Sequence, residues 1–140
     1  MKQIGNIVKL FINKKEISSI QCDEYGIIGD KFYKKDKKRS ILLSSLHSYS
    51  LANNNNIKIN HGLLGENILL DFNPYTLPLG TIIKIGEVNL KISQECTLCK
   101  HLSSIDSKLP KLLKNDRGIF VYALNDGVIN LNDKVYIDEK

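Results

Sequence analysis

The chain has 140 residues, of which 42% are hydrophobic and 25% charged, a composition that predicts one domain over residues 1–140 and excludes a disordered tail or a fibre. No apolar run reaches the length of a secretory signal or a membrane span, so the sequence predicts a cytoplasmic location and no membrane partner. The formal charge of +5 would attract anions, although the abundance of lysine, asparagine and isoleucine along the chain is equally consistent with a coding bias.

The first third of the chain predicts short strands separated by a glycine turn. Residues 3–12 and 16–22 are apolar-rich runs of the β type. Two glycines within residues 26–30 bracket a tight bend, and the stretch 31–39 follows with six cations. Residues 40–44 then predict a buried strand.

The rest of the chain predicts one short helix, over residues 45–52, and further strands. A glycine-bounded turn at 61–68 leads into a strand, and residues 85–88 and 125–127 have the composition of hairpin turns. About seven short strands result, with no βαβ alternation and no internal repeat. The sequence therefore predicts a mainly β (α+β) barrel or sandwich with one or two short helices.

The densest group of reactive side chains lies at residues 95–101, ECTLCKH, directly after a predicted strand. Apolar residues recur there on one face of a helix: Leu98, Leu102, Ile105 and Leu109. With Thr97 as the N-cap, Cys99 would lie in the first helical turn, where unpaired backbone N–H groups and the helix dipole favour an anion. Lys100 and His101 add positive charge, so the pattern indicates a thiolate, which is both a nucleophile for sulfur transfer and a soft metal ligand.

Three other interpretations of these cysteines stay open. Cys96 and Cys99 could be small apolar side chains of the core. A Cys-x-x-Cys pair is also typical of thioredoxin-type redox sites, but the βαβ setting of those sites is missing from the pattern. A zinc site would need four ligands, and His47, His61 and His101 would have to complete it by chance.

The sequence resembles the MOSC family, named for the C-terminal domain of molybdenum cofactor sulfurase. The resemblance spans residues 5–137 and lies in a series of short stretches that follow the family's order. These stretches are 26–30 (GIIGD), 39–43 (RSILL), 62–68 (GLLGENI), 77–80 (LPLG), 85–86 (IG), 93–99 (SQECTLC), 117–118 (RG) and 127–135 (GVINLNDKV).

The resemblance implies a β-barrel and marks Cys99 as the family's characteristic cysteine, which carries sulfur to the molybdenum of the pterin cofactor or ligates that metal. Some members reduce N-hydroxylated compounds, with a partner reductase. In the sulfurases a pyridoxal-phosphate domain supplies the sulfur; these residues contain none, so a protein such as a cysteine desulfurase would be the donor. The implied function is a molybdenum-cofactor-binding or sulfur-carrier protein, and enzyme activity is left open.

Five further residues are candidates for binding this cofactor. The Asn67 amide could contact the pterin edge or shape a turn. Glu66 could act as a general acid or base, or form a salt bridge. Arg39 and Lys38 end the cationic stretch and could bind the phosphate of the cofactor or face solvent. Arg117 could reach an anion or have a structural use.

The alternative function is a non-catalytic anion- or nucleic-acid-binding module that uses residues 31–39. Phe32 and Tyr33 could stack on bases, and affinity would then fall steeply with salt. The sequence contains no recognised nucleic-acid-binding motif, which makes nucleic acid the less favoured partner. A MOSC-like fold kept only for protein contacts is a third possibility.

Overall fold

The computed structural model describes residues 1–96 and 100–138. The strands are β1 (Lys2–Ile12), β2 (Lys15–Ile17), β3 (Ser19–Asp23), β4 (Gly26–Ile27), β5 (Ile41–Ser45), β6 (Ile68–Leu70), β7 (Ile82–Ile85), β8 (Val88–Glu95), β9 (Ile119–Ala123), β10 (Gly127–Asn130) and β11 (Lys134–Ile137). The helices are the 3-10 helix η1 (Lys37–Arg39) and the α-helices α1 (Leu46–Asn54), α2 (Lys100–Ile105) and α3 (Leu109–Leu112).

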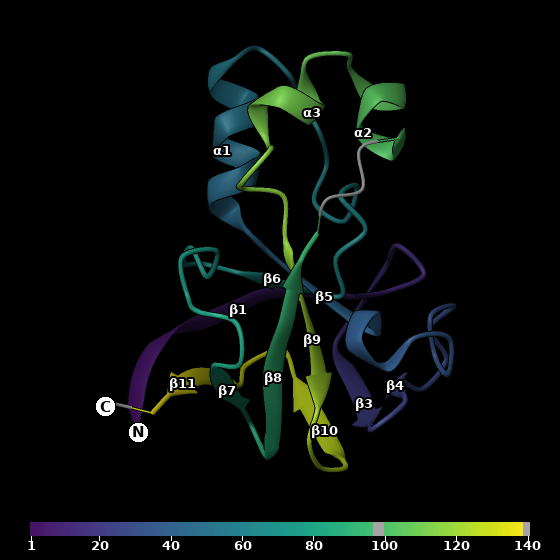
Figure 1. The fold of residues 1–140 in the computed structure, drawn as a ribbon, viewed down its shortest axis with the longest axis vertical. Helices are drawn as coiled ribbons and strands as arrows, with labels where there is room; N and C mark the ends of the chain where they lie inside the picture. The colour runs from purple at the N-terminus through teal and green to yellow at the C-terminus, as the bar shows by residue number, and fades with distance from the viewer. Residues whose placement is uncertain (97–99, 139–140) are drawn as a thin grey trace.

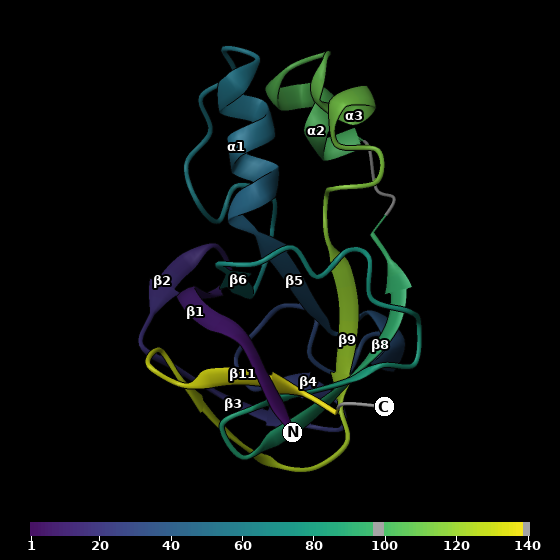
Figure 2. The same cartoon turned by 90° about the vertical axis from the view of Figure 1, so that its left-hand side faces the viewer.

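The strands build a closed barrel with a small sheet beside it. In the main sheet β11, β7, β8, β9, β5, β6 and β1 follow one another, and β11 also pairs with β1, so these seven strands close a ring (Figure 1, Figure 2). β2 extends β1 as a hairpin, and β10, β3 and β4 form a separate three-stranded sheet. The predicted mainly β barrel of about seven strands is confirmed.

The α-helices gather at one end of the barrel (Figure 1). Apolar residues of the helices and of the adjoining strands and loops form a second core there: Phe11, Tyr49, Ala52, Ile57, Leu64, Leu69, Leu102, Leu109 and Leu113. α1 confirms the helix predicted for residues 45–52, and it begins after Ser45, whose hydroxyl accepts a hydrogen bond from the backbone N–H of His47 at 3.0 Å. Across residues 1–96 and 100–138, no helix is both long and apolar enough to cross a membrane.

Over its described part, residues 100–109, the predicted helical face is divided between two helices. α2 ends at Ile105, and α3 carries Pro110 in its first turn. A proline lacks the backbone N–H and disfavours a helical residue before it, which opposes one continuous helix. Leu102 and Leu109 are nevertheless buried in the same core, so the predicted apolar face is used by two short helices.

Of the two predicted hairpin turns, one is confirmed and one is wrong. The turn at Gly86, which has φ of +58°, joins the antiparallel pair β7 and β8. Residues 125–127 do not close a hairpin, because β10 pairs with β3 instead of β9. The Asn125 side chain accepts from the Asn89 N–H at 2.8 Å and donates to the Glu87 carbonyl at 2.8 Å. This turn residue therefore ties its loop to the β7–β8 hairpin.

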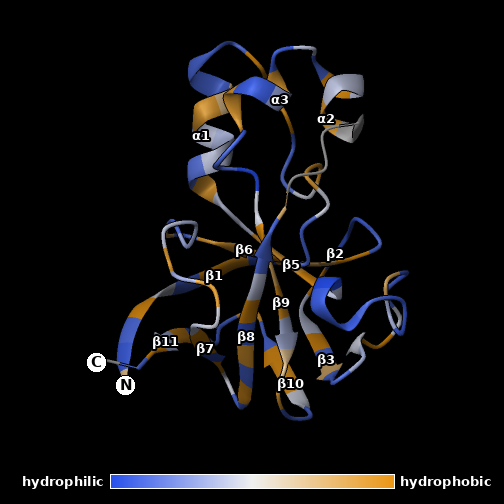
Figure 3. Cartoon of the chain, viewed as in Figure 1, coloured by the Kyte–Doolittle hydropathy of each residue, from blue (hydrophilic) through white to orange (hydrophobic). Residues whose placement is uncertain are grey.

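The barrel core follows the alternation of the strands. Polar and apolar residues alternate along β8 (Figure 3), and its inward side chains are the buried ones. β5 differs because every one of its residues is buried. Ile41 and Leu43 point into the barrel core, whereas Leu42 packs outside it with Phe120 and Cys96. A second layer of chain must therefore cover the outer face of β5.

Cys22 on β3 lies in the barrel core with 1% of its surface exposed. Burial, together with the charge of Asp23, raises the pKa of its thiol from 9.0 to about 12. The Cys22 thiol ionises at a lower pH in the unfolded chain than in the folded protein. Its contribution to the free energy of unfolding is therefore complete below about pH 9 and is lost as the pH rises towards 12. We expect wild-type protein to lose more stability than Cys22→Ala between about pH 8 and about pH 11, as measured by urea unfolding. Parallel pH profiles of the two proteins would contradict this prediction.

Candidate functional site

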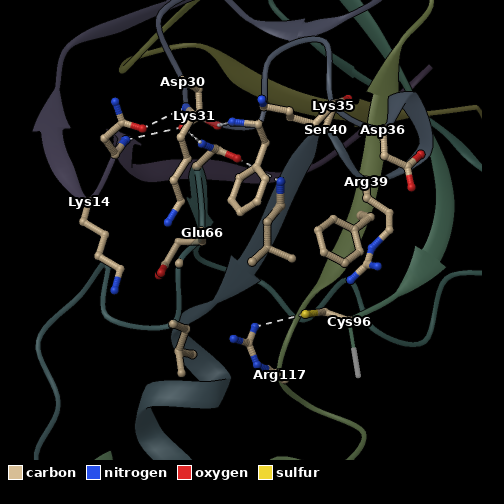
Figure 4. A pocket seen from close by; sticks show the side chains of 17 residues that line it. Lys14, Asp30, Lys31, Lys35, Asp36, Arg39, Ser40, Glu66, Cys96 and Arg117 are labelled. Carbon is tan, nitrogen blue, oxygen red and sulfur yellow. Dashed lines mark hydrogen bonds between the residues drawn. The ribbon is translucent and has the colours of Figure 1, made fainter. Parts of the chain in front are cut away.

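A pocket of about 580 Å³ lies against the outer face of the barrel wall. Leu42 of β5 and Phe120 of β9 line it, whereas their neighbours Leu43 and Val121 belong to the barrel core. The remaining walls come from the loop between β4 and β5, the turn between β1 and β2, the loop before β6, and the facing ends of β8 and β9 (Figure 4). Segments far apart in the sequence therefore meet around one cavity.

The buried carboxylate of Asp30 holds two of these walls together. Its Oδ1 accepts hydrogen bonds from the Asn67 side-chain amide at 3.1 Å and from the Asn13 backbone N–H at 3.3 Å. Its Oδ2 accepts from the Phe32 N–H at 3.0 Å. Asp30 therefore positions the β1–β2 turn and the cationic loop at the pocket, and both of its oxygens are already engaged.

The pocket has a cationic rim. Its members are Lys14, Lys31, Lys35 and Arg39. The guanidinium of Arg39 lies 5.1 Å from the centre of the Phe120 ring, which fixes its plane over an apolar surface. Asp36, which also lines the pocket, accepts a hydrogen bond from the Lys38 N–H and so caps η1. The rim is therefore suited to an anionic group such as a phosphate.

For two candidates the structure favours the second of the two alternatives that the sequence left open. Lys38 is exposed and does not line the pocket, because η1 turns it away while presenting Arg39. Asn67 lines the pocket, but its Oδ1 accepts from the Leu42 N–H at 3.0 Å and its amide group donates to Phe11 and Asp30. The side chain has thus used its hydrogen-bonding groups within the fold, which favours the interpretation of Asn67 as a turn-shaping residue.

Glu66 lies in the floor of the pocket with 1% of its surface exposed. Its Oε2 accepts from the Ser44 hydroxyl at 2.7 Å and from the Tyr49 hydroxyl at 2.5 Å. Burial, then the charge of Glu66 and the hydrogen bond to it, raise the pKa of Tyr49, which keeps that hydroxyl protonated as a donor. The other oxygen, Oε1, has no hydrogen-bond partner within residues 1–96 and 100–138.

The loop that carries Glu66 is shaped by Gly62. This residue has φ of +91°, and a Cβ added to it would lie 2.8 Å from the Phe11 ring. Its backbone N–H donates to the Tyr49 hydroxyl at 3.0 Å, so the same tyrosine binds both the loop and the carboxylate. Glu66 is therefore held in place on two sides, and only Oε1 is left for a ligand.

Arg117 and Cys96 form the opposite end of the pocket (Figure 4). The guanidinium Nη1 donates to the Cys96 sulfur at 3.1 Å, and Arg117 is only 6% exposed. Its Nε is buried and has no partner in the part of the chain that the structure describes. The sequence leaves two alternatives for Arg117, anion binding and a structural use. In the structure its side chain faces the pocket and keeps one donor, Nε, for a ligand. Cys96 packs against Leu42 and Phe120 as an apolar side chain does, yet it also lines the pocket.

The prediction for Cys99 falls outside the described residues, as does the N-cap predicted for Thr97. Both stay predictions.

Within residues 1–96 and 100–138 no three or more His, Cys, Asp or Glu side chains are grouped to hold a metal ion. His47 pairs with Asp116 at 3.4 Å, and His61 packs edge-on against Tyr49 at 4.8 Å between ring centres.

Several pocket residues could not be identified from the sequence. Lys14 comes from the β1–β2 turn with φ of +67°. Phe120 comes from a strand whose alternate residues, Ile119, Val121 and Ala123, face the barrel core. Neither lies near a reactive residue in the sequence. For Cys96 a signal was present, since it is one half of the Cys-x-x-Cys pair.

Comparison with known proteins supports the fold and indicates a family. The family model for the MOSC domain matches residues 30–136. Among solved structures, the fold is similar to the YuaD protein from Bacillus subtilis, with a TM-score of 0.84 and 17% identity over 96% of both chains. It is also similar to YiiM from Escherichia coli, with a TM-score of 0.75 and 17% identity over 94% of this chain and 68% of that one. No curated protein matches the chain significantly.

Proposed function

The chain belongs to the MOSC domain family, and on that premise we propose that its pocket binds the molybdenum cofactor and that a cysteine thiolate carries sulfur to the molybdenum or ligates it. This family is generally linked to that cofactor. At 17% identity the similar structures support only the fold, so the function is argued from the residues of the pocket.

The residues of the pocket fit such a ligand. The cofactor combines a phosphate with a pterin ring that has both N–H donors and a carbonyl acceptor. The cationic rim suits the phosphate, and Arg39 is the residue whose fork is best matched to it. Glu66 Oε1 could accept from ring N–H groups, and Arg117 Nε could donate to an oxygen. A volume of about 580 Å³ lies in the range of small-molecule sites.

One observation carries the proposal: an acceptor on Glu66 and a donor on Arg117 line the same pocket, buried and without partners among the described residues. Buried polar groups are nearly always hydrogen-bonded in native proteins, and each exception needs an explanation. A ligand that offers both a donor and an acceptor satisfies the two groups at once. The free pocket is therefore an incomplete hydrogen-bonding site.

In this proposal the chain's own residues hold the anion, orient the ring and present a thiolate, while the bound cofactor supplies a metal that exchanges oxygen or sulfur ligands. Cys99 is the thiol that the family resemblance indicates. The partner would be a sulfur donor such as a cysteine desulfurase, or a reductase if the chain takes part in reduction of N-hydroxylated compounds. A cytoplasmic location would keep the thiol reduced.

The test is cofactor content after purification from a host that makes the cofactor. We expect a fluorescent pterin on oxidative release, together with molybdenum in metal analysis. Each charge-assisted hydrogen bond contributes about 1.5–3 kcal/mol, so Lys35→Ala combined with Arg39→Ala should lower the bound pterin about tenfold or more.

Cys99→Ser should lose persulfide or molybdenum while keeping the fold, which intact mass spectrometry and circular dichroism would check.

Lys134→Ala is the matched control, because Lys134 is an exposed cation on β11 that does not line the pocket. It should retain the pterin. If wild-type protein from the producing host carries no pterin and takes none up from released cofactor, the proposal is refuted.

The nucleic-acid alternative is not favoured by the geometry of the cationic loop. The Tyr33 hydroxyl donates to Asp23 at 2.5 Å, and its ring packs edge-on against Tyr25. Phe32 is exposed, but Lys31 lies over its ring at 5.1 Å. A salt-dependent gel shift with single-stranded nucleic acid would revive this alternative.

A further inference from the structure

We infer that Cys96 is a second sulfur-accepting thiol of this chain, held at the end of the pocket by Arg117 and able to take a sulfane sulfur from a persulfide donor. The inference deepens the proposed function, on which it rests, because it assigns part of the sulfur chemistry to a residue other than Cys99.

Cys96 is fixed by two contacts with the chain segment that leads into β9. Its backbone N–H donates to the Gly118 carbonyl at 2.9 Å, and its sulfur accepts from Arg117 Nη1 at 3.1 Å. The Arg117 carbonyl in turn accepts from the Tyr75 hydroxyl at 3.4 Å. Backbone and side chain thus orient the sulfur towards the pocket, which Cys96 lines (Figure 4).

Arg117 brings a positive charge that no described residue balances. Within the described part of the chain Arg117 forms no ion pair, and its Nε has no partner at all. A thiol is a weak acceptor, so it compensates a buried guanidinium poorly. An anionic sulfur accepts this hydrogen bond more strongly, because charge-assisted hydrogen bonds are about twice as strong as neutral ones. The site is therefore completed by negative charge on or beside the Cys96 sulfur.

Of the two described cysteines, Cys96 has this environment and Cys22 does not. Both cysteines are free and buried. Cys22 lies in the barrel core, does not line the pocket, and has Asp23 as its charged neighbour, so that its pKa is raised to about 12. Cys96 instead has a guanidinium as its neighbour and opens onto a cavity. One chain thus contains an inert thiol that serves as an internal control for the other.

The transfer needs no oxidant. The Cys96 thiolate attacks the outer sulfur of a donor persulfide, R–S–SH, and forms a new S–S bond while the S–S bond of the donor breaks. The donor leaves as the thiolate R–S⁻, and Cys96 becomes a persulfide, Cys96–S–SH. The proton stays on the transferred sulfur or is lost to water, and the resulting anion would face Arg117. The donor class is a protein or low-molecular-weight persulfide.

The experiment uses full-length reduced protein and glutathione persulfide as the donor, with four chains compared: wild type, Cys96→Ser, Cys99→Ser and Cys96→Ser/Cys99→Ser. Iodoacetamide caps the products, and intact mass with peptide mapping locates each added sulfur of about 32 mass units. We expect Cys99→Ser to gain a sulfur at Cys96, and the double variant to gain none at Cys22.

Arg117→Lys and Arg117→Met test the positioning role through a readout other than cofactor loading. Both should slow the alkylation of Cys96 about tenfold or more, and leave that of Cys22 unchanged, because the sulfur loses its guanidinium partner. Thermal unfolding checks that each variant is folded. Arg117→Lys retains a buried charge and serves where Arg117→Met does not fold.

Failure of this inference and failure of the proposed function give different results. If Cys99→Ser takes up no sulfur while wild type takes up one at Cys99, the inference is overturned and the proposed function stands. If the pterin binds but no cysteine accepts sulfur, the sulfur-carrier role of both thiols is excluded. If Cys96 alone accepts sulfur and no pterin binds, the inference holds without the cofactor.

Discussion

Replacing Glu66 by alanine is expected to lower the free energy of unfolding by about 2–4 kcal/mol, because two buried hydroxyl donors lose their acceptor. The Ser44 and Tyr49 hydroxyls both donate to Glu66 Oε2, at 2.7 and 2.5 Å. Tyr49 is also the residue that fixes the loop at Gly62, so the loss should spread to the pocket wall. Urea unfolding measures the effect, and the slope of ΔG against urea should stay unchanged.

Glu66→Gln separates the structural role of this residue from its proposed role towards a ligand. The glutamine carbonyl can still accept from Ser44 and Tyr49, so the stability should fall by about 1 kcal/mol or less. Its amide group would then replace Oε1 and present donors to the pocket. A ring N–H that bonds Glu66 in the proposed complex would meet a donor instead of an acceptor. We therefore expect Glu66→Gln to fold well and to lose most of the bound pterin.

The control for the charge change is Glu24→Gln. Glu24 is exposed and forms an ion pair with Lys37 at 3.9 Å on the surface. This variant should match wild type in both stability and pterin content, since exposed ion pairs contribute little. If Glu66→Gln binds pterin as well as Glu24→Gln does, Glu66 is a structural residue only, and the pterin edge must be bound elsewhere.

The barrel could be predicted because its strands follow elementary alternation. Along β8, Val88, Leu90 and Ile92 are buried and their neighbours are not, which is the pattern of a strand with one face on a core. The turn at Gly86 has the local chemistry of a hairpin. These signals lie within a few residues of one another, so no knowledge of the rest of the fold is needed to interpret them.

Strand pairing over long distances could not be predicted in the same way. Asn125 has the composition of a hairpin turn, yet its side chain binds the backbone of Asn89 and Glu87, and the following strand pairs with β3. A turn residue supplies hydrogen-bonding groups to whichever loop lies beside it. The residues around position 125 do not indicate that β10 pairs with β3, because this pairing depends on closure of the whole barrel.

The candidate site could be predicted only in part. Glu66 and Arg117 were candidates from the sequence, and both line the pocket with a polar atom that has no partner among the described residues. Asn67 was an equal candidate, but Leu42, Phe11 and Asp30 use its amide, and these partners lie 25 to 56 residues away in the sequence. Tertiary contacts decide which polar groups remain free to bind a ligand. Residue type and spacing therefore identify the candidate residues but do not rank them.

Leu43→Ala is expected to cost about 3–5 kcal/mol of unfolding free energy, the range for a leucine in a packed core, whereas Leu42→Ala should cost about 2 kcal/mol. Leu43 is fully buried between Ile68 of β6 and Ile119 of β9 in the barrel, so its loss leaves a cavity. Leu42 points the other way and borders a pocket that already exists, so mainly the transfer free energy is lost. Urea unfolding of the two variants measures the difference, and pterin content should fall only for Leu42→Ala. Equal costs would contradict this prediction, because they would mean that the pocket face of β5 is packed as tightly as the barrel interior.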